Sequence, residues 1–266
     1  MKKIISVSYK DDTPAFFAEE FFDNLKKGNV DVENKFGKFT ISLKPEDVYC
    51  FVFWTKNCSD YFIEHLKDVS SPYYIQWTID GYGKDLEPMV PDKHEILERF
   101  KKVSEIVGRS RMFWRYDPIL ISEKYTVEYH SRAFSEMCRI LNGYTDRCVI
   151  SFLDEYDKIR DDVDKGIMRK PTVEEIKTMC EAFSTVAKEN EITIQTCSER
   201  KYDLSEYGIQ EAPCVDGNYI EKEFGIKIPE SIKHPKEHFR DCLCSKNTDI
   251  GRFHRCKHDC RFCYAK

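Results

Sequence analysis

Short apolar runs alternate with longer amphipathic stretches along most of this chain. Continuous apolar runs rich in β-branched and aromatic residues are typical of strands that are buried on both faces. On this pattern we predict six strands, at residues 4–8, 48–54, 73–79, 111–116, 148–153 and 192–196. The second of them is apolar throughout, from Val48 to Trp54.

Helical periodicity occupies the gaps between these strands. From Ile96 to Val107, apolar residues recur at intervals of three and four, which places them on one face of a helix. Thr13 followed by Pro14 is a favourable helix start, so we predict an aromatic-rich first helix there. Two more helices are predicted at 126–141 and 172–188.

The order of these elements predicts the fold class. A series of strand–helix units folds into a parallel sheet with helices outside it, and residues 30–43 add a small hairpin around a turn at 34–37. We therefore expect an α/β fold in which residues 1–196 form a (β/α)6 partial TIM-like barrel. Residues 197–266 form a cysteine-rich tail folded onto it. A full eight-stranded barrel is the alternative, because further short strands fit within residues 202–239.

Composition and charge narrow the class of protein. Hydrophobic residues make up 41% of the 266 and charged residues 33%, which is ordinary for a globular protein with a core. The net charge of −5 gives no general attraction to nucleic acid. No apolar run approaches the roughly 20 residues that span a membrane, and the N-terminus is more typical of a strand than of a signal peptide. We expect a cytoplasmic protein with no membrane partner.

The 12 cysteines fall into two classes. Without a secretion signal, a disulfide framework is not expected. Five cysteines lie among apolar residues and are expected to be small buried side chains: Cys50, Cys58, Cys138, Cys148 and Cys180. The other seven crowd into the last quarter of the chain, which packing alone does not explain.

The last three cysteines have a spacing that suits an iron–sulfur cluster. Cys256, Cys260 and Cys263 form C-x3-C-x2-C, and three thiolates on a four-iron cluster leave one iron open to a small molecule. With the aromatic Phe262 before the last cysteine, the motif resembles that of radical S-adenosylmethionine (SAM) enzymes, whose partial barrel has six strands. We assign cofactor binding to Phe262 and Tyr264. Zinc is the competing metal, since it also takes closely spaced thiolates.

Four cysteines remain: Cys197, Cys214, Cys242 and Cys244. Four thiolates saturate a cluster or a tetrahedral zinc ion, so we predict a second, closed metal site there. Cys242 and Cys244 are two residues apart, so in an extended segment their thiols point the same way.

Polar residues lie within and directly after the predicted strands, where the chemistry of βα barrels is located. A buried polar group without a partner costs about 1–3 kcal/mol, so these side chains need each other, water or a ligand. We assign catalytic roles to Lys56, Arg115 and Asp117. Cofactor binding is assigned to Thr55, Gln76, Thr78 and Gln195. The structural alternative for Arg115 and Asp117 is an ion pair, and for His254 and His258 we leave open metal ligation or support of the ligands.

Taken together, the motifs resemble domain-of-unknown-function family 1848 over residues 5–265. The resemblance rests on several short stretches: 12–16, 53–57, 81–83, 86–88, 114–119, 144–146, 197–199, 214–216, 242–244, 249–251 and 256–264. It implies a cysteine cluster similar to that of radical SAM proteins and no established activity. The chain departs from the patterns in having Tyr9-Lys10 where the family has paired arginines. It places the cluster motif at the C-terminus and lacks a Gly-Gly-Glu stretch that grips SAM.

Two functions from different classes follow. In the first, a reduced [4Fe-4S] cluster cleaves SAM, and the resulting radical acts on a small molecule or modified nucleic acid in the barrel, with ferredoxin or flavodoxin as electron donor. In the second, zinc or a cluster staples the tail of a non-catalytic binding protein. The sequence does not name the substrate.

Overall fold

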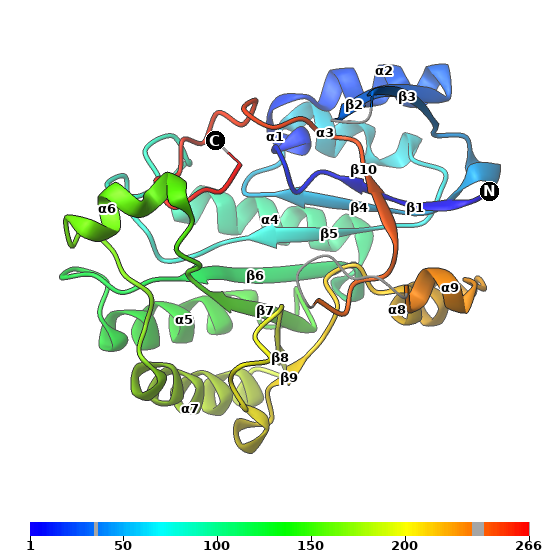
Figure 1. The fold of residues 1–266 in the computed structure, drawn as a ribbon. Coiled ribbons are helices and arrows are strands. Elements are labelled where there is room, and N and C mark those ends of the chain that lie inside the picture. Colours follow the sequence, from blue (N-terminus) through cyan, green and yellow to red (C-terminus); the bar gives the residue numbers. More distant parts are fainter. Residues whose placement is uncertain (35–36, 236–241, 266) are drawn as a thin grey trace.

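The structure is a computed structural model that describes residues 1–34, 37–235 and 242–265. Its centre is an eight-stranded sheet with the order β10-β1-β4-β5-β6-β7-β8-β9, in which every neighbouring pair is parallel (Figure 1). The strands are β1 (Lys3–Val7), β4 (Val48–Thr55), β5 (Tyr73–Thr78), β6 (Met112–Ile119), β7 (Arg147–Phe152), β8 (Thr193–Thr196), β9 (Gln210–Glu211) and β10 (Asn247–Asp249). The α/β class is confirmed, and the six predicted strands are β1 and β4 to β8.

A separate hairpin follows the first helices. Strands β2 (Asn29–Asn34) and β3 (Gly37–Ser42) pair antiparallel, with Val30 opposite Ile41. The predicted insertion is therefore confirmed, although residues 35 and 36 of its turn lie outside the described residues. The hairpin begins directly after Gly28, whose φ of 77° ends the preceding helix in the left-handed region that favours glycine.

Nine α-helices lie among the described residues. They are α1 (Thr13–Phe16), α2 (Ala18–Lys27), α3 (Asp60–His65), α4 (Lys93–Val107), α5 (Val127–Leu141), α6 (Arg160–Asp164), α7 (Val173–Glu189), α8 (Gly217–Phe224) and α9 (Glu230–Lys233). Side-chain caps set several starts: Thr126 begins α5, and Thr172 with Glu175 forms a capping box on α7. The single first helix that we predicted is wrong, because the chain breaks at Phe17 into α1 and α2.

The two faces of the sheet have different covers. Side chains alternate along each strand, so on β4 Phe51 and Phe53 join the large core under the helices, whereas Cys50 and Val52 face the other way. That second face packs against Tyr219, Ile220 and other residues of α8 and α9 in a smaller apolar cluster. The polar residues of this face, nearer the carboxyl ends of the strands, therefore lie next to an apolar cluster.

The edges of the sheet are strands that the sequence pattern did not predict. Within the described residues, β9 pairs only with β8 and β10 only with β1, so the sheet is open and the alternative of a closed eight-stranded barrel is wrong. Strand β10 brings the C-terminal tail, orange to red in Figure 1, to the carboxyl end of β1. Among the described residues, every helix is too short or too polar to span a membrane.

Candidate functional site

The C-terminal tail is fixed to the first strand by Asp249. Its carboxylate accepts hydrogen bonds from Ser8 Oγ at 2.8 Å and from the backbone of Tyr9 and Gly251 at 3.0 Å each. Gly251 is needed for this approach, because a Cβ atom there would lie 2.0 Å from Ser8 Oγ. The tail therefore enters the site in one defined position, directly beside the loop that follows β1.

Beyond this point the tail loops over the carboxyl ends of the strands. Arg255 pairs with Glu20 of α2, and Arg261 pairs with Asp162 of α6 through two hydrogen bonds of 3.0 and 2.6 Å. The Arg261 amide donates to the Leu86 carbonyl at 2.9 Å. These contacts hold both sides of the loop that carries the terminal cysteines.

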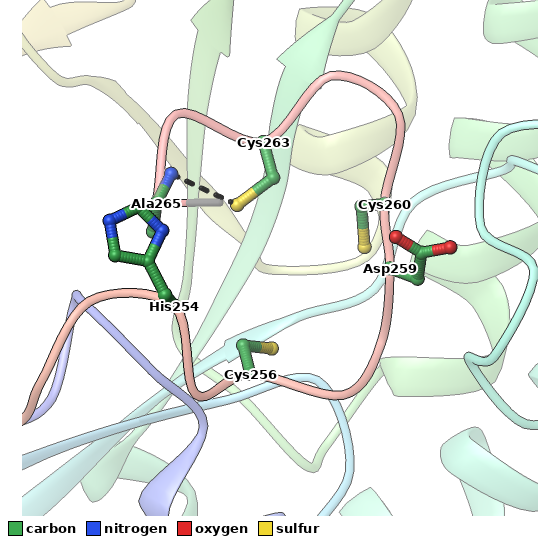
Figure 2. A pocket seen from close by; sticks show the side chains of 6 residues that line it. All are labelled: His254, Cys256, Asp259, Cys260, Cys263 and Ala265. Carbon is green, nitrogen blue, oxygen red and sulfur yellow. Dashed lines mark hydrogen bonds between the residues drawn. The ribbon is translucent and has the colours of Figure 1, made fainter. Parts of the chain in front are cut away.

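The three terminal thiols surround one hollow. Figure 2 shows Cys256, Cys260 and Cys263 projecting into the loop that the tail forms. The hollow measures about 240 Å³ and is also lined by His254, Asp259 and Ala265. Small-molecule pockets measure roughly 300–1,000 Å³, so this space suits a compact group, and a larger ligand has to extend out of it.

A single metal ion and a cluster make different demands on these thiols. A zinc ion draws its ligands to within about 2.0–2.3 Å of one point. In the described part of the chain, no group of three or more His, Cys, Asp or Glu side chains is arranged to hold a metal ion. A four-iron cluster instead gives each thiolate its own iron, so its ligands stand apart around a hollow. The residues present fit that requirement.

His258 supports the loop between the first two of these cysteines. It is buried, and its Nε2 atom lies 2.8 Å from Oδ2 of Asp12. Asp12 also caps α1 through Ala15 and accepts the Lys56 amide at 2.6 Å. Nδ1 of His258 has no hydrogen-bond partner among the described residues. His258 therefore supports the loop without lining the hollow, whereas His254 lines the hollow itself.

Two buried carboxylates and two partly buried lysines lie next to Cys260. The Lys56 ammonium lies 2.9 Å from Asp80 Oδ2 and 2.5 Å from Glu87 Oε1, and Lys93 contacts the same two carboxylates. Glu87 is also 3.9 Å from the Cys260 thiol. Burial raises the pKa of the Glu87 carboxyl, as does the neighbouring Asp80. We call Lys56, Asp80, Glu87 and Lys93 the charged quartet.

Burial favours the protonated form of two of the terminal thiols, those of Cys256 and Cys260. Burial raises the pKa of the Cys256 thiol to about 12 and that of Cys260 well above its ordinary value. The ammonium of Lys56 acts in the opposite direction on the pKa of Cys260. Since iron takes thiolates, binding of a metal group has to release these protons, and Lys56 favours that release at Cys260.

Gln76 of β5 and Arg115 of β6 lie together on the face of the sheet that α8 and α9 cover, which we call the inner face. The guanidinium of Arg115 pairs with Asp117, lies 3.3 Å from Gln76 Oε1 and donates to the thiol of Cys214 at 3.0 Å. Gln76 is fully buried and donates to the Cys214 carbonyl at 2.7 Å. Ser151 donates to Asp117. The predicted ion pair of Arg115 with Asp117 is present, and the polar groups satisfy one another.

The other predicted residues are more dispersed. Thr55 is buried and accepts the amide of Asn57 at 2.9 Å. Thr78 and Gln195 are half-buried, and neither has a side-chain hydrogen bond to another described residue. Phe262 lies against Tyr82 with ring centres 5.3 Å apart, whereas the hydroxyl of Tyr264 donates to the carbonyl of Tyr9.

The four cysteines of the predicted second site are close together. The side chains of Cys197 and Cys214, of Cys214 and Cys244, and of Cys244 and Cys242 are near enough to interact. Cys244 lowers the pKa of the Cys242 thiol to about 6. The pKa of each of the other three thiols is raised by one neighbouring thiol and by burial, although Cys197 lowers that of Cys214 and Cys214 lowers that of Cys244.

Sequence reasoning missed several residues of the terminal site. Asp12 and Glu87 fall within stretches that carry the family resemblance, and Asp80 directly follows the third predicted strand, but these positions alone give them no role. Lys93 carries no signal, because a lysine in the first turn of an amphipathic helix is ordinary. The path of the chain from Asp80 to Lys93 brings Lys93 to the same carboxylate that Lys56 contacts.

Comparisons with known proteins identify a family whose function is unknown. A family model described as a domain of unknown function, DUF1848, matches residues 4–265. No curated protein matches the chain. One solved structure, described as inhibition of the pneumococcal virulence factor StrH with insights into N-glycan recognition and hydrolysis, aligns at 10% identity and a TM-score of 0.27. The alignment covers 73% of this chain and 52% of that one, and a likeness this slight carries no argument.

Proposed function

This chain belongs to the DUF1848 family, and we propose that it is an iron–sulfur enzyme of the radical SAM kind. The observation that carries the proposal is the hollow at the carboxyl ends of the strands, lined by Cys256, Cys260 and Cys263. Three separate thiols around a compact space suit a cluster with three protein-bound irons and one open iron. The order of β1 and β4 to β8 also agrees with a (β/α)6 partial barrel of the radical SAM type.

The residues around the hollow prepare it for such a group. Lys56 places a positive charge near Cys260, which stabilises a thiolate there. Asp12 and His258 fix the loop between Cys256 and Cys260. When bound, the reduced cluster supplies one electron for the cleavage of SAM to methionine and a 5′-deoxyadenosyl radical. An electron donor such as ferredoxin or flavodoxin would have to provide that electron.

The inner face of the sheet offers groups for SAM or a substrate. Arg115 and Gln76 already use their hydrogen bonds on Cys214 and Asp117, so we assign them to positioning. Thr78 and Gln195 remain available, since neither bonds another described side chain or backbone group. Ligand binding should therefore depend on these two more than on Gln76. The substrate class stays open between a small molecule and a modified nucleic acid.

The alternative is a non-catalytic protein in which zinc or a cluster staples the tail. Such a staple is valuable where little else holds a segment in place. Here β10 pairs with β1, Asp249 binds the loop after β1, and two arginines of the tail form ion pairs with α2 and α6. The tail is thus fixed without a metal, which favours a role for the cysteines other than stapling.

Anaerobic reconstitution with iron and sulfide tests the proposal. The loaded protein, reduced with dithionite, should bind SAM and release 5′-deoxyadenosine, and substituting Ala for any one of Cys256, Cys260 and Cys263 should abolish both. Cys138→Ala, in the hydrophobic core, is the matched control and should retain both. Release of 5′-deoxyadenosine by the triple Ala variant would contradict the assignment. Stoichiometric zinc without iron would favour the staple.

A further inference from the structure

Backbone pairing brings three distant segments together on the inner side of the sheet. The parallel pairing of β8 with β9 sets Thr196 opposite Glu211, and the Ala212 amide donates to the Thr196 carbonyl at 3.0 Å. The Ser245 amide donates to the Val215 carbonyl at 2.8 Å. Cys197 follows the first of these contacts, and Cys214 and Cys244 adjoin the second. The fold itself therefore gathers these cysteines.

The four thiols of this region all interact with one another. Cys197 interacts with Cys214, Cys214 with Cys244 and Cys244 with Cys242, and the electrostatic interactions of Cys242 extend back to Cys197 and Cys214. The five remaining cysteines outside the terminal motif lie in the hydrophobic core. Burial of a small apolar side chain accounts for those five, but it does not account for four thiols that meet from three segments.

Polar side chains of β5 and β6 form hydrogen bonds with Cys214. The hydroxyl of Tyr74 and the amide of Gln76 each donate to its carbonyl at 2.7 Å, and Arg115 donates to its sulfur at 3.0 Å. Arg115 is only 5% exposed. Four thiolates around a doubly charged metal centre keep a net negative charge, which a buried guanidinium complements. Donors of this kind orient and tune the sulfur ligands of metal sites.

We propose that Cys197, Cys214, Cys242 and Cys244 bind a thiophilic metal centre in a site closed by protein, distinct from the terminal hollow. The centre is a tetrathiolate zinc ion or an iron–sulfur cluster. In the described residues the four thiols are not arranged around one point that a metal ion could occupy. Binding requires Cys197 and Cys242 to close in and the thiols to release their protons. This site does not depend on radical SAM activity.

The test begins with a variant in which Cys256, Cys260 and Cys263 are replaced by Ala, so that the terminal site contributes nothing. Purified without oxygen, it should retain about one zinc or about four irons with sulfide per chain. Adding Cys197→Ser and Cys242→Ser should remove that metal. Adding Cys138→Ser and Cys180→Ser to the same triple variant is the matched control and should leave it. Zinc or iron identifies the centre.

Alkylation followed by mass spectrometry gives a second measurement, on the otherwise unaltered chain. Cys197 and Cys242 should resist iodoacetamide in the loaded protein and react after the metal is removed with a chelator. Retention of protection at Cys242 by the triple variant would support the site even if its metal content were low. No metal in the triple variant, together with equal alkylation of the unaltered chain with and without chelator, would overturn the proposal. Failure of SAM cleavage has no effect on either measurement.

Discussion

Asp12 and His258 are 246 positions apart in the chain, yet Nε2 of His258 lies 2.8 Å from Oδ2 of Asp12. The same carboxylate caps α1 and accepts the amide of Lys56. One buried side chain thus joins the loop after β1, the loop after β4 and the loop that carries the terminal cysteines.

Replacement of Asp12 should weaken both the fold and the terminal site. Asp12→Ala leaves two backbone amides and a buried imidazole without their acceptor, so we expect the free energy of unfolding to fall by about 2–4 kcal/mol. Iron retained after anaerobic reconstitution should also fall. Asp31→Ala removes only an exposed hydrogen bond to Thr40 and should change stability by less than about 0.5 kcal/mol. Equal urea midpoints for the two variants would contradict this.

Lys56 should be more important to stability than a surface lysine. Lys56→Met leaves Asp80 and Glu87, whose side chains are 1% exposed, with Lys93 as their remaining partner in the charged quartet. Breaking a buried pair in this way costs about 3–5 kcal/mol. Lys38→Met, whose partner Glu33 is exposed, is the control and should cost below about 1 kcal/mol. Adding Glu87→Gln to Lys56→Met should recover part of the loss in chemical denaturation.

Gln76 should stabilise the position of Cys214 and have little effect on the affinity for SAM. Gln76→Ala removes a fully buried donor to the Cys214 carbonyl, so we expect a loss of about 1–3 kcal/mol in the free energy of unfolding. SAM affinity, measured by calorimetry on the reconstituted protein, should stay within about twofold. Thr78→Ala should show the opposite pattern, with little loss of stability. A large loss of SAM affinity in Gln76→Ala would show that Gln76 contacts the ligand.

A methyl group at Gly251 should displace the tail from the sheet. Gly251→Ala places Cβ 2.0 Å from Ser8 Oγ and 2.3 Å from Ser8 Cβ. We expect faster proteolysis of the tail and loss of iron at the terminal site, with the sheet intact by circular dichroism. Adding Ser8→Gly removes both clashing atoms and should restore part of the protection. If Gly251→Ala protects the tail as well as the unaltered chain does, the close approach is incorrect.

His130 should make stability fall in mild acid. Burial lowers the pKa of its imidazole. Nε2 donates to the Leu120 carbonyl and Nδ1 accepts from Tyr116, each at 2.8 Å, as a neutral ring does. The unfolded chain therefore binds a proton first, and stability is lost as pH falls below about 6.5. The slope contributed is up to about 1.4 kcal/mol per pH unit. His130→Gln should flatten the dependence between pH 6.5 and 5 in urea titrations; an unchanged slope would contradict it.

The sequence by itself determined the six inner strands, the hairpin and the main helices. Their signals are local: a strand such as 48–54 is apolar throughout, and Thr172 with Glu175 marks the start of α7 within four residues. It also indicated that the first five cysteines are buried, because they are scattered among apolar residues. Spacing alone separated the terminal three from the other four.

Only the tertiary structure decided how these parts meet. Three residues of β10 have no strand pattern of their own, and their pairing with β1 comes from the edge that β1 leaves open. Lys93 joins Lys56 through carboxylates from the loop between β5 and α4. Gln76 and Arg115 are 138 and 99 positions from Cys214, yet the fold makes Cys214 a partner of both. Such contacts depend on the path of the whole chain, because residues far apart in sequence leave no periodic pattern.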